Sequence, residues 1–360
     1  MSSVFDCFAV SPPGLESLTA QELSSLGLVP KILPGGVSFQ GGLKEIYLTN
    51  LYLRTASRIL LKVGSFKALH FEELVQRVAR YPWEIYLSQA DRVRLRVTCR
   101  RSKLYHSKAV AERVLKGLSL RLGRKIELAQ EEAPLLIVRL WRDEVLLRID
   151  TSGADLFKRG YKVASGPAPL RENLAAALIY LARWDGQTPF LDPFCGTGTI
   201  PIEAALMAAH IPPGWWRSFA FQEWKNFKAS LWEELREEAR KHFRVPKVEI
   251  WANDISPKAV KAARENSKAA GVEDFLRFSQ EDVALLEPPA HRGLIVTNPP
   301  YGERLQRKAY QKFALFLKKH FPRWQALFLS PNKKPLKEFS LKTLARFEHG
   351  GLRVYALQVV

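Results

Sequence analysis

The sequence predicts an α/β protein in which a doubly wound, mostly parallel sheet follows an N-terminal α+β segment. Apolar strands alternate with longer helices over 169–360, a Gly- and Pro-rich stretch precedes them over 153–168, and short strands mix with helices before it. Strands that alternate with helices produce a parallel sheet covered on both faces. A chain of 360 residues has room for two or three domains.

The N-terminal segment begins with an apolar strand, 4–10, and a helix, 12–27, that has Pro and Gly at its entry and a glycine at its exit. A strand and turn follow over 37–42. Residues 43–64 start with apolar side chains at helical spacing and end in the apolar strand RILLKV. A helix is predicted over 70–80.

A basic strand follows this helix. Its apolar residues Val93, Leu95, Val97 and Cys99 alternate with Arg92, Arg94, Arg96 and Thr98. A period of two predicts a strand with one apolar face and one exposed, basic face. A helix over 106–122 and two strands, 135–141 and 144–150, joined by the tight turn Arg142-Asp143, complete the α+β segment.

The C-terminal segment contains six apolar strand candidates: TPFLDPF, EIWAND, LRFSQED, GLIVTNPP, ALFLS and RVYALQVV. The first two are separated by a long segment, about 206–247. Its aromatic cluster, Trp215, Trp216, Phe219, Phe221 and Trp224, is predicted to pack in a core, with base stacking as the alternative.

The chain is strongly basic, with 55 Lys and Arg against 36 Asp and Glu, a net charge of +19. Residues 1–160 carry +9 and residues 161–360 carry +10, which excludes a single basic tail as the source. Such an excess favours a polyanionic partner, either nucleic acid or an anionic membrane surface. The alternative is a basic surface that serves solubility alone.

The three cysteines, Cys7, Cys99 and Cys195, are far apart and odd in number. This argues against a disulfide framework or a structural zinc site. The sequence also lacks a leader-like N-terminus and any run of about 18 apolar residues. We therefore expect a soluble protein of a reducing cytoplasm with no metal and no membrane contact.

The sharpest motif is a strand that ends in a Gly-rich turn: Asp192, Pro193, Phe194, Cys195, Gly196, Thr197, Gly198 and Thr199. Glycines allow tight bending and close approach of a ligand, and ligands of α/β sheets bind at the carboxyl ends of strands. No Lys-Ser/Thr follows, so this is not a phosphate-binding P-loop, nor is it GxGxxG. A purely structural turn is the alternative.

Acidic residues stand at the ends of the next two strands. Asp254 precedes a helix that Pro257 opens and can accept hydrogen bonds from two ribose hydroxyls, whereas Asp282 can accept from an adenine amine. Either acid alone is more often a helix cap or a turn residue than a ligand contact. The ordered set is what points to a nucleoside-containing cofactor.

The fourth strand ends in Asn298-Pro299-Pro300-Tyr301. Two prolines stiffen the backbone and leave carbonyls free to accept, so Asn298 and Pro299 can together accept both protons of a planar exocyclic amine. Tyr301 can stack on the attached base. An ordinary Asn-Pro turn is the alternative.

Together these motifs resemble the class I S-adenosylmethionine-dependent methyltransferases, and NPPY resembles the subgroup that methylates exocyclic amines of bases. The resemblance implies S-adenosylmethionine as cofactor and a Rossmann-like domain over 169–360. The implied cofactor residues are Asp192, Pro193, Phe194, Cys195, Gly196, Thr197, Gly198, Thr199, Asp254, Ile255, Asp282 and Val283. The implied catalytic residues are Asn298, Pro299, Pro300 and Tyr301.

Segments outside these motifs, among them APLRENLAAALI, DLFKRGYK and PPGWWRSFAFQEW, resemble bacterial large-subunit rRNA guanine-N2 methyltransferases. The resemblance implies a ferredoxin-like domain over 1–60, an RNA-binding THUMP domain over 61–152 and a linker over 153–168. It implies rRNA as partner, in a free or ribosome-assembly form, and methylation of guanine N2. Methylation of tRNA, a DNA amino-methyltransferase and a noncatalytic RNA-binding factor are the alternatives.

The basic strand supplies the candidate phosphate contacts. These are Arg92, Arg94, Arg96, Arg100, Arg101, Lys103 and Lys108. A solvated strand face without a ligand is the alternative.

Overall fold

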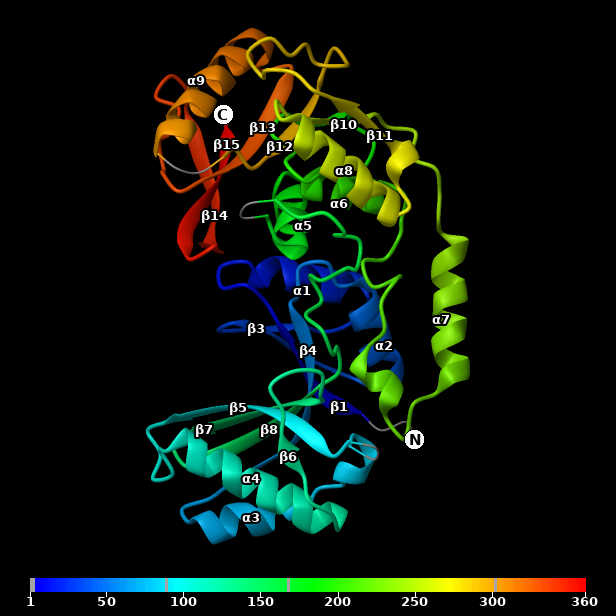
Figure 1. Ribbon diagram of the computed structural model, residues 1–360, viewed down its shortest axis with the longest axis vertical. Helices are drawn as coiled ribbons and strands as arrows, with labels where there is room; N and C mark the ends of the chain where they lie inside the picture. The colour runs from blue at the N-terminus through cyan, green and yellow to red at the C-terminus, as the bar shows by residue number, and fades with distance from the viewer. Residues whose placement is uncertain (1–3, 88–89, 167–168, 301–302) are drawn as a thin grey trace.

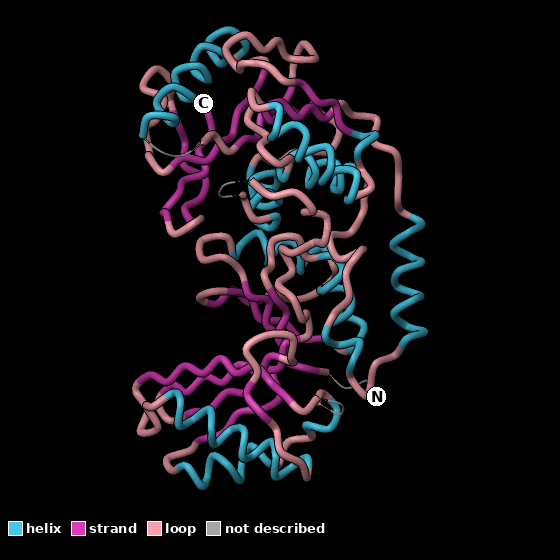
Figure 2. Tube along the Cα trace, viewed as in Figure 1, coloured by secondary structure: helices cyan, strands magenta, loops and turns pink. Residues whose placement is uncertain are grey.

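The computed structural model describes residues 4–87, 90–166, 169–300 and 303–360, and of 303–306 the backbone alone. Two sheets organise the chain (Figure 1). We name three units by their order in the sequence: the first unit (residues 4–57, with α1 and α2), the middle unit (68–150, with α3 and α4) and the C-terminal unit (169–360). In Figure 1 the C-terminal unit lies at the top of the view, the middle unit at the bottom and the first unit between them. Figure 2 shows helices alongside strands in all three units.

The N-terminal sheet has eight strands in the order β2-β3-β1-β4-β8-β7-β5-β6. They are β1 (Phe5–Val10), β2 (Lys31–Leu33), β3 (Gly36–Gly41), β4 (Arg58–Lys67), β5 (Arg92–Arg100), β6 (Glu127–Leu128), β7 (Leu135–Trp141) and β8 (Glu144–Asp150). The helices of this half are α1 (Glu16–Ser25), α2 (Leu43–Tyr52), α3 (Phe71–Ala79) and α4 (Ser107–Leu122).

Strand β4 joins the first and middle units into one sheet. Its first residues, 58–61, pair with β1 and residues 60–67 pair with β8, both antiparallel. Leu61 pairs with Cys7 on one side and with Ile149 on the other, and all three are buried in one apolar core. The first and middle units therefore share a sheet and a core.

The C-terminal sheet has seven strands in the order β11-β10-β9-β12-β13-β15-β14. They are β9 (Phe190–Asp192), β10 (Ile250–Asn253), β11 (Leu276–Ser279), β12 (Gly293–Thr297), β13 (Trp324–Ser330), β14 (Leu341–His349) and β15 (Leu352–Val359). The helices are α5 (Glu172–Leu181), α6 (Thr199–Ala208), α7 (Ala229–Lys241), α8 (Pro257–Ala269) and α9 (Glu303–His320). This confirms the doubly wound, mostly parallel sheet.

The insertion between β9 and β10 leaves the C-terminal unit and packs on the first unit. Phe221 stacks on Tyr47 of α2 with 4.4 Å between ring centroids, and the Tyr47 hydroxyl accepts the Lys228 N–H at 3.0 Å. Phe219, Phe221 and Trp224 are buried, as predicted for core packing, whereas Trp216 is 44% exposed. Trp215 is half-buried and packs against the core. The aromatic prediction is thus confirmed for four residues and wrong for Trp216.

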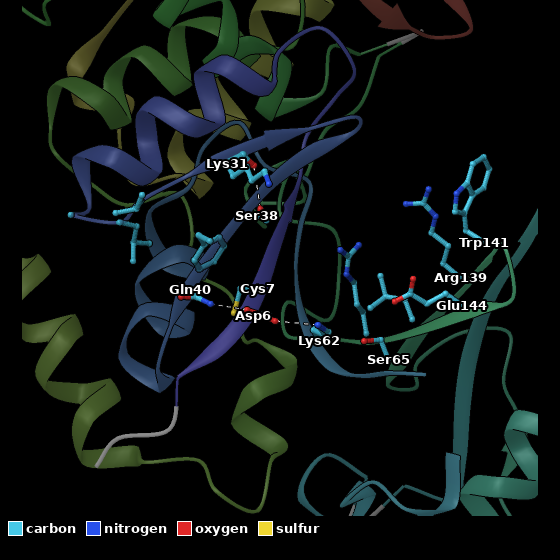
Figure 3. Close-up of a pocket in the computed structure, with 16 residues that line it drawn as sticks. Asp6, Cys7, Lys31, Ser38, Gln40, Lys62, Ser65, Arg139, Trp141 and Glu144 are labelled. Carbon is cyan, nitrogen blue, oxygen red and sulfur yellow. Dashed lines mark hydrogen bonds and ion pairs between the residues drawn. The ribbon is translucent and has the colours of Figure 1, made fainter. Parts of the chain in front are cut away.

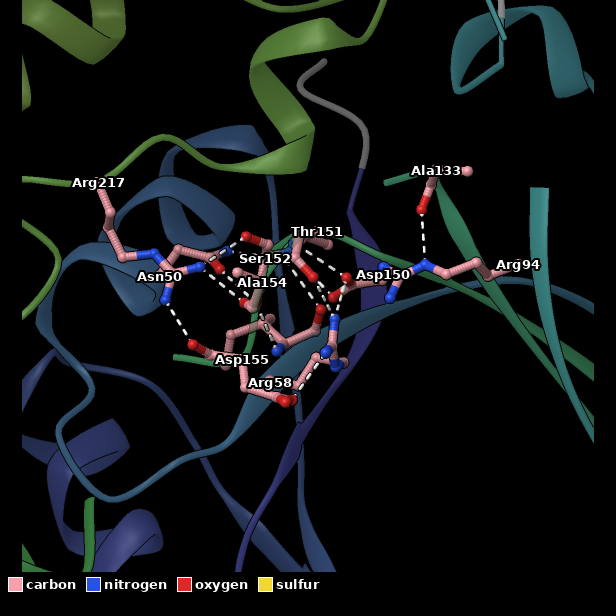
Figure 4. Close-up of polar contacts among 12 residues, drawn as sticks. Asn50, Arg58, Arg94, Ala133, Asp150, Thr151, Ser152, Ala154, Asp155 and Arg217 are labelled. Atoms are coloured by element: carbon pink, nitrogen blue, oxygen red, sulfur yellow. Dashed lines mark hydrogen bonds and ion pairs between the residues drawn. The ribbon is translucent and has the colours of Figure 1, made fainter. Parts of the chain in front are cut away.

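A polar network holds the stretch after β8 in place (Figure 4). The Arg58 guanidinium forms ion pairs with the buried Asp150 and with Asp155. Arg217, from the insertion, donates to the carbonyls of Ser152, Ala154 and Asp155 at 2.7–3.1 Å. The connection between the two sheets is therefore held by one arginine that precedes it in the sequence, Arg58, and one that follows it, Arg217.

Three strands were not predicted: β2, β6 and β14. The first two have only three and two residues, too short for a periodic signal. Strand β14 pairs with β15 through a bulge between Thr343 and Ala345, which interrupts the alternation that would identify it. The helix expected over 12–27 begins only at Glu16.

Candidate functional site

The carboxyl ends of β9 and β12 meet at the centre of the C-terminal sheet. Strand β9 pairs with β10 on one side and β12 on the other, so successive connections run in opposite directions from this point. Ligands of open α/β sheets bind at such a switch point. The Gly-rich turn follows β9 and the NPPY motif follows β12, which places both predicted motifs there.

The Gly-rich turn is shaped by two glycines in the left-handed region. Gly196 has φ +53 and Gly198 has φ +83. A Cβ at Gly198 would come within 3.0 Å of the Ala263 Cβ on α8, so glycine permits close helix packing there. A Cβ at Gly196 would meet nothing within 4 Å. The turn therefore leaves open space beside Gly196, where a ligand can approach the backbone.

Asp254 connects the Gly-rich turn to the end of β10. Its Oδ2 accepts the Gly196 N–H at 3.0 Å, and its Oδ1 accepts the Ser256 N–H at 2.9 Å. The next side chain, Ile255, is 60% exposed. A carboxylate beside an exposed apolar side chain is the combination that suits a ribose and the flat face of a base.

Asp282, the second acidic strand end, has a partner that the sequence did not reveal. It forms an ion pair with Lys312 of α9, and its Oδ1 accepts the Ala284 N–H at 3.1 Å. Burial raises the pKa of Asp282, but the Lys312 contact and the Ala284 N–H outweigh this, and the pKa lies below its usual value. Asp282 is thus held as a carboxylate, which can accept hydrogen bonds only.

Asp192 is enclosed, with 1% of its surface exposed. Its Oδ1 accepts the Thr297 Oγ1 hydroxyl at 2.6 Å and the Phe194 N–H at 3.1 Å. Burial, with a smaller contribution from the charge of Asp254, raises its pKa to about 7. Asp192 therefore ties the Gly-rich turn to the residue that precedes Asn298.

Asn298 is half-buried, Pro299 is buried and Pro300 is exposed at the end of β12. Tyr301 lies outside the described residues. Phe194 is half-buried and packs edge-on against Phe313 at 5.8 Å between centroids. The structure thus brings Asn298 and the two prolines to the edge of the sheet that carries the Gly-rich turn.

The remaining predicted cofactor residues lie in the Gly-rich turn, except Val283, which follows β11. Pro193, Cys195, Thr199 and Val283 are buried, whereas Thr197 is half-buried. Burial raises the pKa of Cys195 well above its usual value, so this thiol is not a nucleophile at neutral pH. The roles of all these residues toward a cofactor stay predictions.

Two asparagines that the sequence analysis missed hold the site together. Asn253 donates to the Pro193 carbonyl at 3.2 Å and the Glu281 carbonyl at 2.9 Å. Asn266 of α8 donates to the Thr197 carbonyl at 3.0 Å and exchanges two bonds of 2.9 Å with Ala164. The only available signal was Asn253 before Asp254, because the contacts of Asn266 reach residues far away in sequence.

The predicted phosphate contacts lie on β5, on the loop after it and, for Lys108, in the first turn of α4. Arg92, Arg96, Arg100, Arg101, Lys103 and Lys108 are exposed, whereas Arg94 is half-buried and donates to the Ala133 carbonyl at 2.9 Å. The alternation of β5 is confirmed. Contact of these residues with RNA stays a prediction.

Within the described residues, no group of three His, Cys, Asp or Glu side chains could hold a metal ion. Nor does that part of the chain contain a helix that is long and apolar enough to cross a membrane.

Comparison with known proteins gives consistent results. Residues 159–354 match the RMKL-like methyltransferase domain and residues 6–60 the RlmL ferredoxin-like domain. YpsC of Bacillus subtilis, provisionally named an RNA methyltransferase, is 36% identical over 84% of this chain and 81% of its own. The large-subunit rRNA methyltransferase K/L of Cellvibrio japonicus is 36% identical over 95% of this chain. This chain spans about half of that protein, 49%.

Solved structures match along nearly the whole chain. SMU.472, a provisionally assigned methyltransferase in complex with SAH, has a TM-score of 0.88 and 31% identity, covering 99% of this chain and 98% of its own. A Listeria monocytogenes protein has a TM-score of 0.86 and 34% identity, covering 98% and 96%. The latter carries the name of an N6-adenine-specific DNA methylase, so the names of the similar proteins differ in the base and the nucleic acid.

Proposed function

Because this chain belongs to the RMKL-like methyltransferase family, we propose that it transfers a methyl group to the exocyclic N2 amine of a guanine in RNA. Its cofactor is S-adenosylmethionine. The proposed substrate is large-subunit rRNA, which the K/L relatives are named for. A guanine of tRNA is the second candidate, because the Bacillus subtilis relative is named for RNA without the class of RNA.

The residues at the switch point fit this cofactor. Open space beside Gly196 leaves room for the methionine part, the Asp254 carboxylate can accept from the ribose, and Asp282 can accept from the adenine amine. Ile255 is exposed and supplies apolar surface for the adenine ring, whereas Val283 is buried in the core beside Leu191 and Leu286. When bound, the cofactor supplies a methyl group on a positively charged sulfur, which needs no further activation.

Asn298 carries the proposed chemistry. It stands at the carboxyl end of β12, and its neighbour Thr297 is bonded to Asp192 at the start of the Gly-rich turn. A guanine amine is a weak nucleophile because its lone pair is delocalised into the ring. Acceptors at Asn298 and Pro299 would hold both amine protons and favour a pyramidal nitrogen whose lone pair faces the cofactor.

An Asn298→Ala variant tests this role. We expect the single-turnover rate of RNA methylation to fall about 100-fold, while the dissociation constant for S-adenosylhomocysteine stays within twofold. Gln187→Ala, which removes an exposed amide before β9 at the opposite edge of the sheet, is the matched control. Near-wild-type turnover by Asn298→Ala would remove Asn298 from the mechanism.

The substrate class is tested with labelled S-adenosylmethionine and separated total rRNA and tRNA, followed by mass spectrometry of the nucleosides. N2-methylguanosine in the large-subunit rRNA is the expected product. The same product in tRNA alone would favour the second candidate, and N6-methyladenosine would overturn the guanine assignment.

A further inference from the structure

A groove crosses the open face of the N-terminal sheet, far from the Gly-rich turn in the fold. It has a volume of about 830 Å³ and is lined by residues of β1, β2, β3, β4, β7 and β8 and of the loop before β2. Figure 3 shows Arg139 and Trp141 on one side and Lys31, Ser38 and Gln40 on the other. The groove therefore spans both the first and the middle unit.

Strand pairing explains why polar side chains collect on this face. Paired residues point to the same side of a sheet, and Arg96 pairs with Ile137, Ile137 with Arg148, and Arg148 with Lys62. The opposite face carries Leu136 and the other apolar residues that pack with α3 and α4. Arg96, one of the predicted phosphate contacts, thus belongs to the same surface as the groove.

Two arginines of the groove are not neutralised. Among the residues that the structure describes, Arg139 and Arg148 form no salt bridge. Arg148 is half-buried with its guanidinium 4.3 Å from the centroid of the Phe8 ring. Burial, and then the charge of Arg139, lowers the pKa of Arg148. Because neither Arg139 nor Arg148 is paired with a carboxylate, the two charges together favour the binding of an anion.

Trp141 lies among arginines at one end of the groove. The guanidinium carbons of Arg101, Arg139 and Arg142 lie 5.2, 5.9 and 5.9 Å from its ring centroid. The ring is half-buried, so part of its surface faces solvent. An aromatic ring surrounded by cations offers a stacking surface beside phosphate-binding groups, which is how proteins bind unpaired nucleotides.

The two carboxylates of the groove do not cancel this charge. Asp6 is bonded to Lys62 at 3.2 Å and to Gln40 at 3.0 Å, which leaves Lys31, Arg139 and Arg148 against Glu144. Glu144 is exposed beside the β7–β8 turn. The lining therefore remains cationic between Lys31 and Trp141.

We propose that this groove binds an unpaired segment of the RNA substrate, with phosphates at Arg139 and Arg148 and a base stacked on Trp141. The proposal rests on the proposed function and adds a surface that extends beyond β5 into the first unit.

The test uses the full chain and a fluorescent 12-nucleotide RNA without secondary structure, with a 12-base-pair RNA duplex as the second probe. For Arg139→Gln/Arg148→Gln we expect about tenfold weaker binding of the unpaired RNA in 0.1 M salt. The salt slope should fall by about 1. Arg77→Gln/Arg80→Gln removes two exposed charges from the α3 side and should change the affinity less than twofold.

Trp141 is tested separately. Trp141→Ala should weaken binding of the unpaired RNA about tenfold, consistent with the loss of one stacked base, whereas Trp141→Phe should retain most of it. Equal effects of the arginine pair and its control would overturn the proposal. So would stronger binding of the duplex, or equally tight binding of a twelve-residue oligoglutamate.

Two further measurements separate this proposal from the proposed function. The arginine variant should bind S-adenosylhomocysteine like the wild type and should raise the KM for rRNA with kcat unchanged. If the wild type methylates guanine N2 but the arginine variant binds RNA as tightly as the wild type, RNA binding in the groove is refuted and the proposed function is not. Groove-dependent RNA binding without any methylated product would refute the proposed function alone.

Discussion

Asp192 is a buried acid between two loops of the site. Its contacts with Thr297 and the Phe194 N–H lower its pKa, but burial dominates and the pKa is raised to about 7 from 3.8. The folded protein thus holds a proton that the unfolded chain releases at lower pH. Stability from this group is complete below about pH 4 and is lost as the pH rises through 7.

Asp192→Asn should remove this pH dependence. Between about pH 4 and 7, the unfolding free energy of the wild type should fall relative to the variant by about 1.4 kcal/mol per pH unit. Urea unfolding of both proteins without cofactor at several pH values measures the difference. A constant difference over this range would contradict a raised pKa at Asp192.

Asp254→Asn tests the proposed ribose acceptor. The amide keeps one acceptor oxygen but loses the charge and the second acceptor, so the bond from Gly196 and the bonds to the ribose cannot all persist. We expect the dissociation constant for S-adenosylhomocysteine to rise about 10- to 100-fold. Calorimetry measures it, and Asp274→Asn, which changes an exposed carboxylate, should leave it unchanged.

The residues of the site were predictable where one motif contains them. Asp192 to Thr199, Asp254 and Asn298 stand at strand ends, and strand ends can be read from apolar runs. Lys312 could not be predicted, because its contact with Asp282 depends on how α9 packs near the loop that follows β11. Asn266 likewise acts through packing of α8 on the Gly-rich turn.

Helices α3 and α4 pack closely at Gly117. A Cβ at this position would lie 2.8 Å from the Val78 Cβ and 2.9 Å from the Val75 carbonyl oxygen. Alanine is the better helix former by about 1 kcal/mol, yet contacts this short force the helices apart. The close approach of α3 and α4 therefore requires glycine at position 117.

Gly117→Ala should destabilise the protein by about 1 to 3 kcal/mol in spite of its better helix propensity. Chemical unfolding measures this change. Lys116→Ala, at an exposed position of the same helix, should change the stability by less than about 1 kcal/mol. An increase in stability of Gly117→Ala would show that the helices can separate at no cost.

At the scale of elements, strands were predicted correctly where the pattern of apolar residues along the strand is regular. Strands β7 and β8 were predicted with the observed bounds, and the turn between them has positive φ at Arg142 and Asp143, as a tight hairpin requires. Strand β14 was missed because its bulge shifts the buried face part-way along.

The first and C-terminal units are joined by buried charges. Glu203 of α6 is fully buried, 3.8 Å from the Arg54 Nη1 and 3.5 Å from the Arg159 Nε, and accepts the Tyr161 hydroxyl at 3.1 Å. Arg54 follows α2, and Arg159 precedes α5. One carboxylate thus compensates two guanidiniums from different parts of the chain.

Glu203→Gln should lower the unfolding free energy by about 3 to 5 kcal/mol, because it removes the carboxylate that pairs with both buried guanidiniums. Guanidinium unfolding followed by tryptophan fluorescence measures the loss. Glu265→Gln, which affects an exposed pair with Lys261 at 4.0 Å, should cost less than about 1 kcal/mol. A loss below 1 kcal/mol for Glu203→Gln would contradict this account.

At the scale of the whole molecule, most strands of the first and middle units could be predicted from the sequence. That the two units share one sheet could not. The apolar run RILLKV identifies β4, yet nothing in it shows that β4 pairs with β1 and β8 at once. The groove across the joined sheet was consequently missed, since its lining comes from six segments that are distant in sequence.

The stacking of Phe221 on Tyr47 also has a consequence during synthesis. Strands and helices of the first unit leave the ribosome early, but the ring that covers Tyr47 is added 174 residues later. At about 5–20 residues per second, this interval lasts roughly 10 to 35 s. For that time the nascent chain exposes an aromatic patch on α2, which is open to chaperones and to premature association with neighbouring chains.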